Sequence, residues 1–164
     1  QENIQGDIVT ISQVSLLHPT THKPKTVSVK IALRKQQHLL LKGPNGIGKS
    51  TLLLQIAHVL SKNIKVIYFS SEESLEQVKS RAERLQLTTD SSHSILFSDQ
   101  AVLDTIISTC IDQKPTVVII DSIQNCSTAD KQSFPGTVAQ LREAAFSLIR
   151  LAKEHRIEIG RAHV

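Results

Sequence analysis

The stretch Gly43-Pro44-Asn45-Gly46-Ile47-Gly48-Lys49-Ser50 decides the fold class of this chain, because it satisfies the pattern G-x-x-x-x-G-K-[ST]. The leucines at 39–41 before it read as a buried strand, and residues 51–60 after it read as a helix. In that setting the glycines let successive backbone N–H groups point inward at phosphate, and the new helix adds its positive end. The sequence therefore predicts a phosphate-binding loop.

Each residue type in this loop has a chemical task. We expect Lys49 to reach the β- and γ-phosphates of a nucleotide, and the Ser50 hydroxyl to bind Mg²⁺. The expected cofactors are therefore ATP and Mg²⁺. The other positions expected to line the nucleotide are Gly43, Pro44, Asn45, Gly46, Ile47, Gly48 and Thr51. The alternative is a glycine-rich turn that binds no ligand.

Composition sets broad limits on the rest. The chain has 164 residues, of which 40% are hydrophobic and 21% charged, as expected for one soluble globular domain. A net charge of +4 permits a polyanionic partner such as nucleic acid without requiring one. Cys110 and Cys126 form no C-x-x-C pair, so we expect no zinc and a reducing, cytoplasmic setting. No apolar stretch approaches membrane-spanning length, so no membrane contact is expected.

Strands and helices are expected to alternate along the chain, which predicts an α/β fold with a mostly parallel sheet and helices on both faces. Expected strands are 65–69, 94–97 and 116–120, the last at the sheet centre because it is the most hydrophobic. Expected helices are 73–85, capped by Ser71 or Ser74, 100–112, and a long one beginning near Val138. Leu75, Val78, Ala82 and Leu85 fall on one face of the first of these helices, and the long helix carries the apolar residues Val138, Leu141, Ala145, Leu148, Ile149 and Ala152.

Acidic residues follow two of these strands. Asp121 closes the 116–120 strand, where its carboxylate would lie beside Ser50 and hold Mg²⁺, partly through water. Glu72 and Glu73 follow the 65–69 strand, which we expect to neighbour the phosphate-loop strand, so one of them would polarise the attacking water. Alternatively, these two are helix N-terminal acids that interact with the helix dipole.

Five motifs then occur in a characteristic order, and together they resemble the RadA/Sms family of bacterial DNA repair ATPases, which have a RecA-like P-loop core. They are Gly46-Ile47-Gly48-Lys49-Ser50-Thr51-Leu52-Leu53-Leu54-Gln55, Phe69-Ser70-Ser71-Glu72-Glu73-Ser74, Arg81-Ala82-Glu83-Arg84-Leu85, Ile120-Asp121-Ser122-Ile123-Gln124 and Pro135-Gly136-Thr137-Val138-Ala139-Gln140-Leu141-Arg142-Glu143.

The resemblance implies an ATP-driven motor that acts on single-stranded DNA and branched recombination intermediates as a hexameric ring. It makes Lys49, Asp121 and Glu72 the catalytic set, with Glu72 as the catalytic glutamate. The loop 125–134 corresponds to a DNA-facing loop, which makes Lys131, Phe134 and Arg142 candidate DNA contacts. The family's four-cysteine zinc module and its Lys-Asn-Arg-Phe-Gly motif are absent from this sequence. We therefore expect a core that is incomplete toward its C-terminus and impaired in turnover on its own.

The first residues resemble a different family. Asp7-Ile8-Val9-Thr10-Ile11-Ser12-Gln13-Val14-Ser15-Leu16 and the run His38-Leu39-Leu40-Leu41-Lys42-Gly43 are similar to the opening of ABC-transporter ATPases. That family places an antiparallel strand pair before the phosphate loop and an aromatic residue on adenine, near the position of His18. Its Leu-Ser-Gly-Gly-Gln signature does not occur here. Residues 1–42 are thus either β-rich decoration of the core or part of another gene joined at the phosphate loop.

The C-terminus raises a similar question. Ile159-Gly160-Arg161-Ala162-His163-Val164 is what ATC-GGA-AGA-GCA-CAC-GTC encodes, a string that matches a common sequencing-library adapter. We hypothesise that the native sequence ends near Ile157, the alternative being a genuine polar tail. The expected organisation is a β-rich N-terminal segment at 1–37, a RecA-like ATPase core at 38–157 and a non-native tail at 158–164. Alternatives for function are an ABC-type ATPase subunit and a nucleotide-binding module without turnover.

Overall fold

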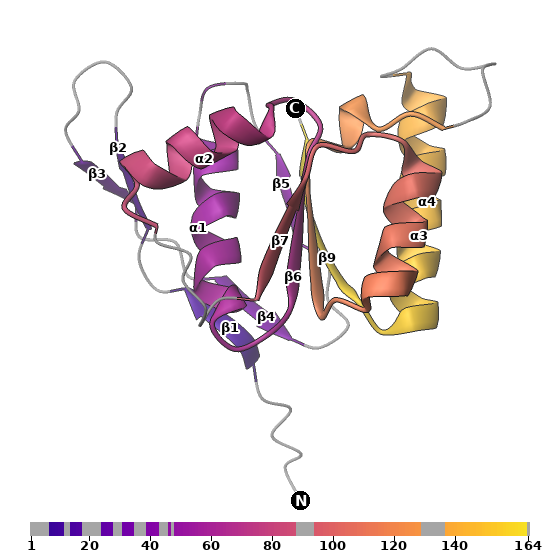
Figure 1. The fold of residues 1–164 in the computed structure, drawn as a ribbon, viewed down its shortest axis with the longest axis horizontal. Helices are drawn as coiled ribbons and strands as arrows, with labels where there is room; N and C mark the ends of the chain where they lie inside the picture. Colours follow the sequence, from indigo (N-terminus) through magenta and orange to yellow (C-terminus); the bar gives the residue numbers. More distant parts are fainter. Residues whose placement is uncertain are drawn as a thin grey trace, which may run out of the picture.

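The computed structural model describes residues 7–11, 14–17, 24–27, 31–34, 39–42, 46, 48–87, 94–128 and 137–163. A five-stranded parallel sheet forms its centre, with α1 and α2 on one face and α3 and α4 on the other (Figure 1). This confirms the predicted fold class. The elements of this core are β5 (Leu39–Lys42), α1 (Lys49–Ser61), β6 (Val66–Ser70), α2 (Leu75–Arg84), β7 (Ile95–Ser98), α3 (Leu103–Gln113), β8 (Val117–Asp121), the 3₁₀ turn η1 (Ile123–Asn125), α4 (Val138–His155) and β9 (Glu158–His163).

Four short strands precede this core. β1 (Asp7–Ile11) pairs antiparallel with β4 (Ile31–Arg34), and β2 (Val14–Leu17) pairs antiparallel with β3 (Pro24–Val27). Both pairs lie toward the α1 side of the molecule (Figure 1). That residues 1–37 form a segment separate from the core stays a prediction.

The order of strands in the central sheet is β5-β9-β8-β6-β7. β8 is the middle strand, as expected, and all five of its residues are buried because helices cover both faces of the sheet. One expectation was wrong: β6 does not neighbour the phosphate-loop strand β5, because β9 and β8 lie between them. A crossover through a helix can pass over sheet positions that later strands fill, so order along the chain does not fix adjacency.

Strand β9 lies between the phosphate-loop strand β5 and the central strand β8. It pairs in parallel with both β5 and β8, and Arg156 in the left-handed region ends α4 just before it. These are the residues for which the sequence suggested a non-native origin. That origin is a question about the gene and stays a prediction.

Two apolar clusters hold the layers together. One fills the space between the sheet and α1 and α2, around Leu53, Ala57 and Tyr68. The other fills the space between the sheet and α3 and α4, around Phe69 and Leu148. Side chains of β6 alternate between the two clusters, so this strand belongs to both. Burial of such clusters on both faces fixes the strand ends that carry the polar residues.

The helix boundaries differ slightly from those expected. α2 begins at Leu75 rather than Glu73, because Ser74 caps it: the Ser74 hydroxyl accepts the Gln77 N–H, and the Gln77 side chain accepts the Ser74 N–H. Leu75 and Val138 follow the apolar periodicity of their helices but are 37% and 66% exposed. Each is the first residue of its helix, and helical periodicity does not tell how far along a helix its contact with the sheet extends.

Candidate active site

The phosphate-binding loop has the backbone that its glycines predict. Gly46 and Gly48 have φ angles of +78° and +95°, in the region that favours glycine. A Cβ on Gly46 would meet no atom within 4 Å, so the backbone angle and not crowding requires glycine there. Gly48 is the N-cap of α1, which makes Lys49 and Ser50 its first two residues. Gly43, Pro44, Asn45 and Ile47 lie outside the described residues.

A pocket of about 330 Å³ lies at the carboxyl ends of the strands, and we call it the strand-end pocket. Its volume is in the range of small-molecule sites. It brings together predicted site residues from three separate parts of the chain: the phosphate loop with α1, the β6–α2 turn and the end of β8. The lining residues are Gly46, Gly48, Lys49, Ser50, Thr51, Glu72, Glu73, Arg81, Asp121 and Ser122.

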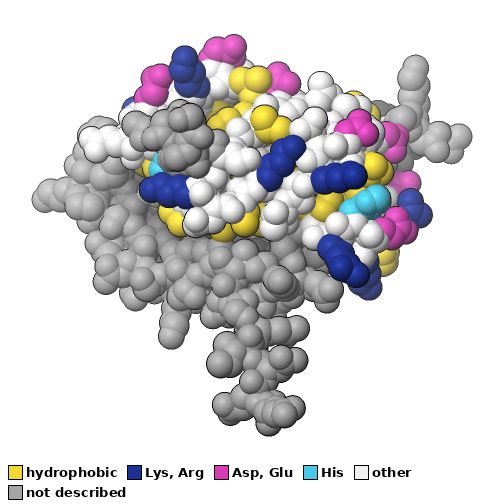
Figure 2. All heavy atoms as spheres, turned by 60° about the horizontal axis from the view of Figure 1, so that its bottom comes forward, with side chains coloured by type: hydrophobic (Ala, Val, Ile, Leu, Met, Phe, Trp, Pro, Cys, Tyr) yellow, Lys and Arg dark blue, Asp and Glu magenta, His cyan; other side chains and the backbone are white. Residues whose placement is uncertain are grey.

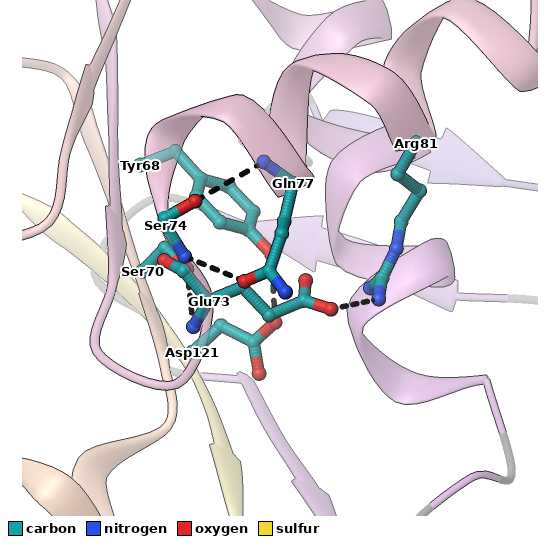
Figure 3. Close-up of polar contacts among 7 residues, drawn as sticks. All are labelled: Tyr68, Ser70, Glu73, Ser74, Gln77, Arg81 and Asp121. Carbon is teal, nitrogen blue, oxygen red and sulfur yellow. Dashed lines mark hydrogen bonds and ion pairs between the residues drawn. The ribbon is translucent and has the colours of Figure 1, made fainter.

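Asp121 ends β8 with only 5% of its surface exposed. The Tyr68 hydroxyl of neighbouring β6 donates a hydrogen bond of 2.8 Å to its Oδ2 atom (Figure 3). Burial first, and then the adjacent Asp121 carboxylate, raises the pKa of Tyr68 well above its usual value. The phenol therefore stays protonated and keeps donating, which holds the Asp121 carboxylate at the edge of the pocket.

The residues present fit a magnesium site of the kind found with nucleotides. Ser50 supplies a hydroxyl and Asp121 a carboxylate within the same pocket. Among the described residues there is no group of three or more His, Cys, Asp and Glu side chains that could hold a metal ion. Mg²⁺ suits a site with few protein ligands, because it keeps several waters and takes the rest from substrate phosphates.

Glu72 is held by the strand next to its own. The Ser122 hydroxyl donates a hydrogen bond to Glu72 Oε1. Ser71 strengthens this link: its hydroxyl donates to the Ser122 carbonyl at 2.7 Å and accepts the Ser122 N–H at 3.0 Å. The turn after β6 is thus fixed to the end of β8, and Glu72 reaches the pocket without adjacency to β5.

Glu73 has a different partner. Its carboxylate forms an ion pair with Arg81, which reaches back from α2 (Figure 3). The two side chains are 28% and 21% exposed. The backbone of Glu73 is held by Ser70, whose hydroxyl donates to the Glu73 carbonyl at 2.8 Å. Glu73 precedes the cap of α2, so it is not a first-turn acid of that helix; Glu76 is.

Three site residues received no role from sequence reasoning: Tyr68, Arg81 and Ser122. Arg81 and Ser122 stand inside two of the motifs that carried the family resemblance, which was the available signal. Nothing in the sequence indicated Tyr68, because an aromatic residue in an apolar strand usually only packs.

The candidate DNA contacts lie elsewhere. Lys131 and Phe134 fall outside the described residues, and Arg142 lies exposed on α4, away from the strand-end pocket. Near it, Gln140 is buried and its Nε2 donates to the Cys126 carbonyl at 2.9 Å, which ties the segment after β8 to α4. On the face in Figure 2, the described Lys and Arg side chains are scattered among other types and form no single patch.

Both cysteines are free thiols in the α3–α4 cluster. Burial raises the pKa of Cys110 to about 12 and that of Cys126 to about 11. Both thiols thus remain protonated and unreactive near neutral pH. Among the described residues, no helix is long and apolar enough to span a bilayer.

Comparison with known proteins gives consistent results. A model of the family described as Novel STAND NTPase 5 matches residues 7–132. The DNA repair protein RadA of Haemophilus influenzae is 42% identical over 121 residues, which are 74% of this chain and 26% of that protein. RadA of Pseudomonas aeruginosa is 43% identical over 116 residues, 71% of this chain and 25% of that protein. The chain thus spans about a quarter of the length of the curated relatives it matches.

Solved structures agree on the fold. A structure described as an ATPase domain superposes with a TM-score of 0.64 at 18% identity, covering 78% of this chain and 57% of that one. The flagellar accessory protein FlaH from Methanocaldococcus jannaschii superposes with a TM-score of 0.58 at 16% identity, covering 78% of this chain and 62% of that one. At these identities the likeness concerns the fold alone, which is that of RecA-like P-loop ATPases.

Proposed function

The chain belongs to the Novel STAND NTPase 5 family and is a P-loop NTPase with a RadA-like core, and we propose that it hydrolyses ATP as the motor core of a DNA repair and recombination protein. One observation carries the proposal: Lys49, Ser50, Glu72 and Asp121 line the same pocket although they come from three segments. The carboxylates of Glu72 and Asp121 repel each other within one pocket, a cost that Mg²⁺ bound together with a nucleotide would offset.

The geometry suggests a role for each of these residues. Lys49 binds the β- and γ-phosphates and offsets their charge. Ser50 and Asp121 would hold Mg²⁺, Asp121 partly through water, and the ion would supply positive charge to offset that of the phosphates. Glu72 has one oxygen engaged by Ser122, which leaves the other to accept a proton from the water that attacks the γ-phosphate.

We propose single-stranded and branched DNA as the partner, a homo-hexameric ring as the assembly and the cytoplasm as the location. The named function of the RadA relatives supports the choice of DNA, and the net charge of +4 is compatible with it. The loop 125–134 would contact the strand through Lys131 and Phe134, with Arg142 beyond it on α4. The Gln140–Cys126 hydrogen bond supports this arrangement, because it connects the segment that follows Asp121 to the helix that carries Arg142.

Phosphate release by the purified chain, with and without single-stranded DNA, tests this function. We expect slow ATP turnover that rises when DNA is added. Turnover indifferent to DNA would instead favour an ABC-type ATPase, to which the strands before the phosphate loop are similar. ATP binding without turnover under either condition would reduce the chain to a nucleotide-binding module.

A further inference from the structure

The strand-end pocket has an unusual balance of charge for a site that receives a polyanion. Three of its lining residues are carboxylates, Glu72, Glu73 and Asp121, and two are cations, Lys49 and Arg81. Every carboxylate there that is not offset repels the phosphates of an incoming nucleotide. The proposed function accounts for Glu72 and Asp121, but it gives Glu73 and Arg81 no task.

The contacts distinguish the adjacent glutamates. Glu72 accepts a hydrogen bond from the neutral Ser122 hydroxyl, so its negative charge remains available to a water molecule. Glu73 instead meets the Arg81 guanidinium, which cancels its charge within the pocket. Both partners are more than two-thirds buried, so water screens their attraction less than it screens a surface pair.

The local structure holds this ion pair in place from both ends. Ser70 accepts the Glu73 N–H at 3.3 Å and donates to its carbonyl, which fixes the backbone that carries the carboxylate. On the other side, the Ser74 cap sets where α2 begins and therefore which of its residues faces back toward the pocket. Arg81 lies two turns beyond that cap, on the side that reaches Glu73 (Figure 3).

We propose that Arg81 is a positioning residue that neutralises Glu73, so that the pocket accepts nucleotide phosphates while Glu72 alone retains a carboxylate free for catalysis. This inference rests on the proposed function, since it presumes that the pocket binds a nucleotide. In it, Arg81 acts through Glu73 rather than through a contact with the phosphates. The two substitutions should therefore compensate for each other.

A double-mutant cycle on ATP affinity tests this, with a fluorescent ATP analogue titrated into the full chain. Arg81→Ala leaves the Glu73 charge exposed to the phosphates and should weaken binding about five- to tenfold, the effect of about 1 to 1.4 kcal/mol. Glu73→Gln added to Arg81→Ala removes that charge and should restore most of the affinity. Arg81→Lys keeps the cation and should bind almost as tightly as the wild type.

Arg84→Ala is the matched control, because it removes an exposed cation from the same helix outside the pocket lining. If Arg81→Ala binds like the wild type, or if the double variant binds as weakly as Arg81→Ala, the proposal is overturned. The latter result would indicate a direct contact of Arg81 with the phosphates. Should Arg81→Ala not fold, Arg81→Lys and Arg81→Gln with and without Glu73→Gln give the same comparison. A wild-type chain that bound no nucleotide would overturn the proposed function itself.

Discussion

The two sides of the central sheet carry different kinds of residue. On the α1–α2 side, charged and hydroxyl side chains gather at the strand ends around one pocket. On the α3–α4 side, the described interior holds apolar residues, two buried thiols and the buried polar side chain of Gln140. Helices cover both sides and a buried apolar cluster fills each, so packing alone does not make a site. The polar residues gather where α1 and α2 begin, because the phosphate loop, the turn after β6 and the end of β8 meet there.

Gln140 links the segment after β8 to α4. Its hydrogen bond to the Cys126 carbonyl anchors α4 to the segment that starts at Asp121. The Cys126 Sγ atom also lies 3.8 Å from the Ser122 carbonyl, within the same short segment. This short segment therefore connects Asp121, at the pocket, with the start of α4. The proposed DNA loop lies between those two points in the chain.

The largest expected effect separates the two adjacent glutamates on the nucleotide side. Glu72→Gln keeps the size and the hydrogen bond from Ser122 but removes the basicity, so ATP turnover should fall about 100-fold while ATP binding persists. Glu73→Gln is the matched control and should reduce turnover much less, because Arg81 already cancels its charge. Single-turnover hydrolysis of radiolabelled ATP measures both. A larger defect from Glu73→Gln would reverse the two assignments.

The next effect tests whether the pocket binds phosphate at all. Lys49→Ala removes the cation expected on the β- and γ-phosphates and leaves the loop glycines in place, so ATP affinity should fall well beyond tenfold, or more than about 1.4 kcal/mol. Isothermal titration with ATP and Mg²⁺ measures it. Lys62→Ala makes the same change at the exposed C-terminal end of α1 and should have no effect. If both variants bind ATP with the same affinity, the assignment of the phosphate-binding loop is wrong.

The contrast between the two sides also explains what the sequence could predict. Asp121 was predictable, because a carboxylate directly after an apolar strand must lie at the carboxyl edge of a parallel sheet. The contact between Arg81 and Glu73 was not, because Ser71 and Ser74 were both possible caps. With Ser71 as the cap, Glu73 would itself lie in the helix, eight residues and about 12 Å of rise from Arg81, too far for an ion pair. The position of β6 also depended on strands that come later in the chain.

The smallest expected effect concerns the proposed DNA loop beside α4. Lys131→Ala combined with Phe134→Ala removes one cation and one aromatic ring, the groups that phosphate attraction and base stacking require. Affinity for single-stranded DNA should fall by about fivefold, the lower end expected for losing one stacked base. The slope of log affinity against log salt should flatten by about 0.7 for the lost phosphate contact. ATP binding should be unchanged.

Fluorescence anisotropy with a labelled oligothymidylate across a salt series measures both quantities. Lys153→Ala combined with Phe146→Ala is the matched control, since it removes the same two residue types from the exposed surface of α4. If DNA runs along the loop, only the loop variant loses affinity and slope. If the α4 variant loses more affinity for DNA, DNA lies along α4 instead. The DNA contacts would then be on the surface of that helix, which also carries Arg142, and not in the loop. If both variants bind DNA as the wild type does, neither the loop nor this surface of α4 contacts DNA.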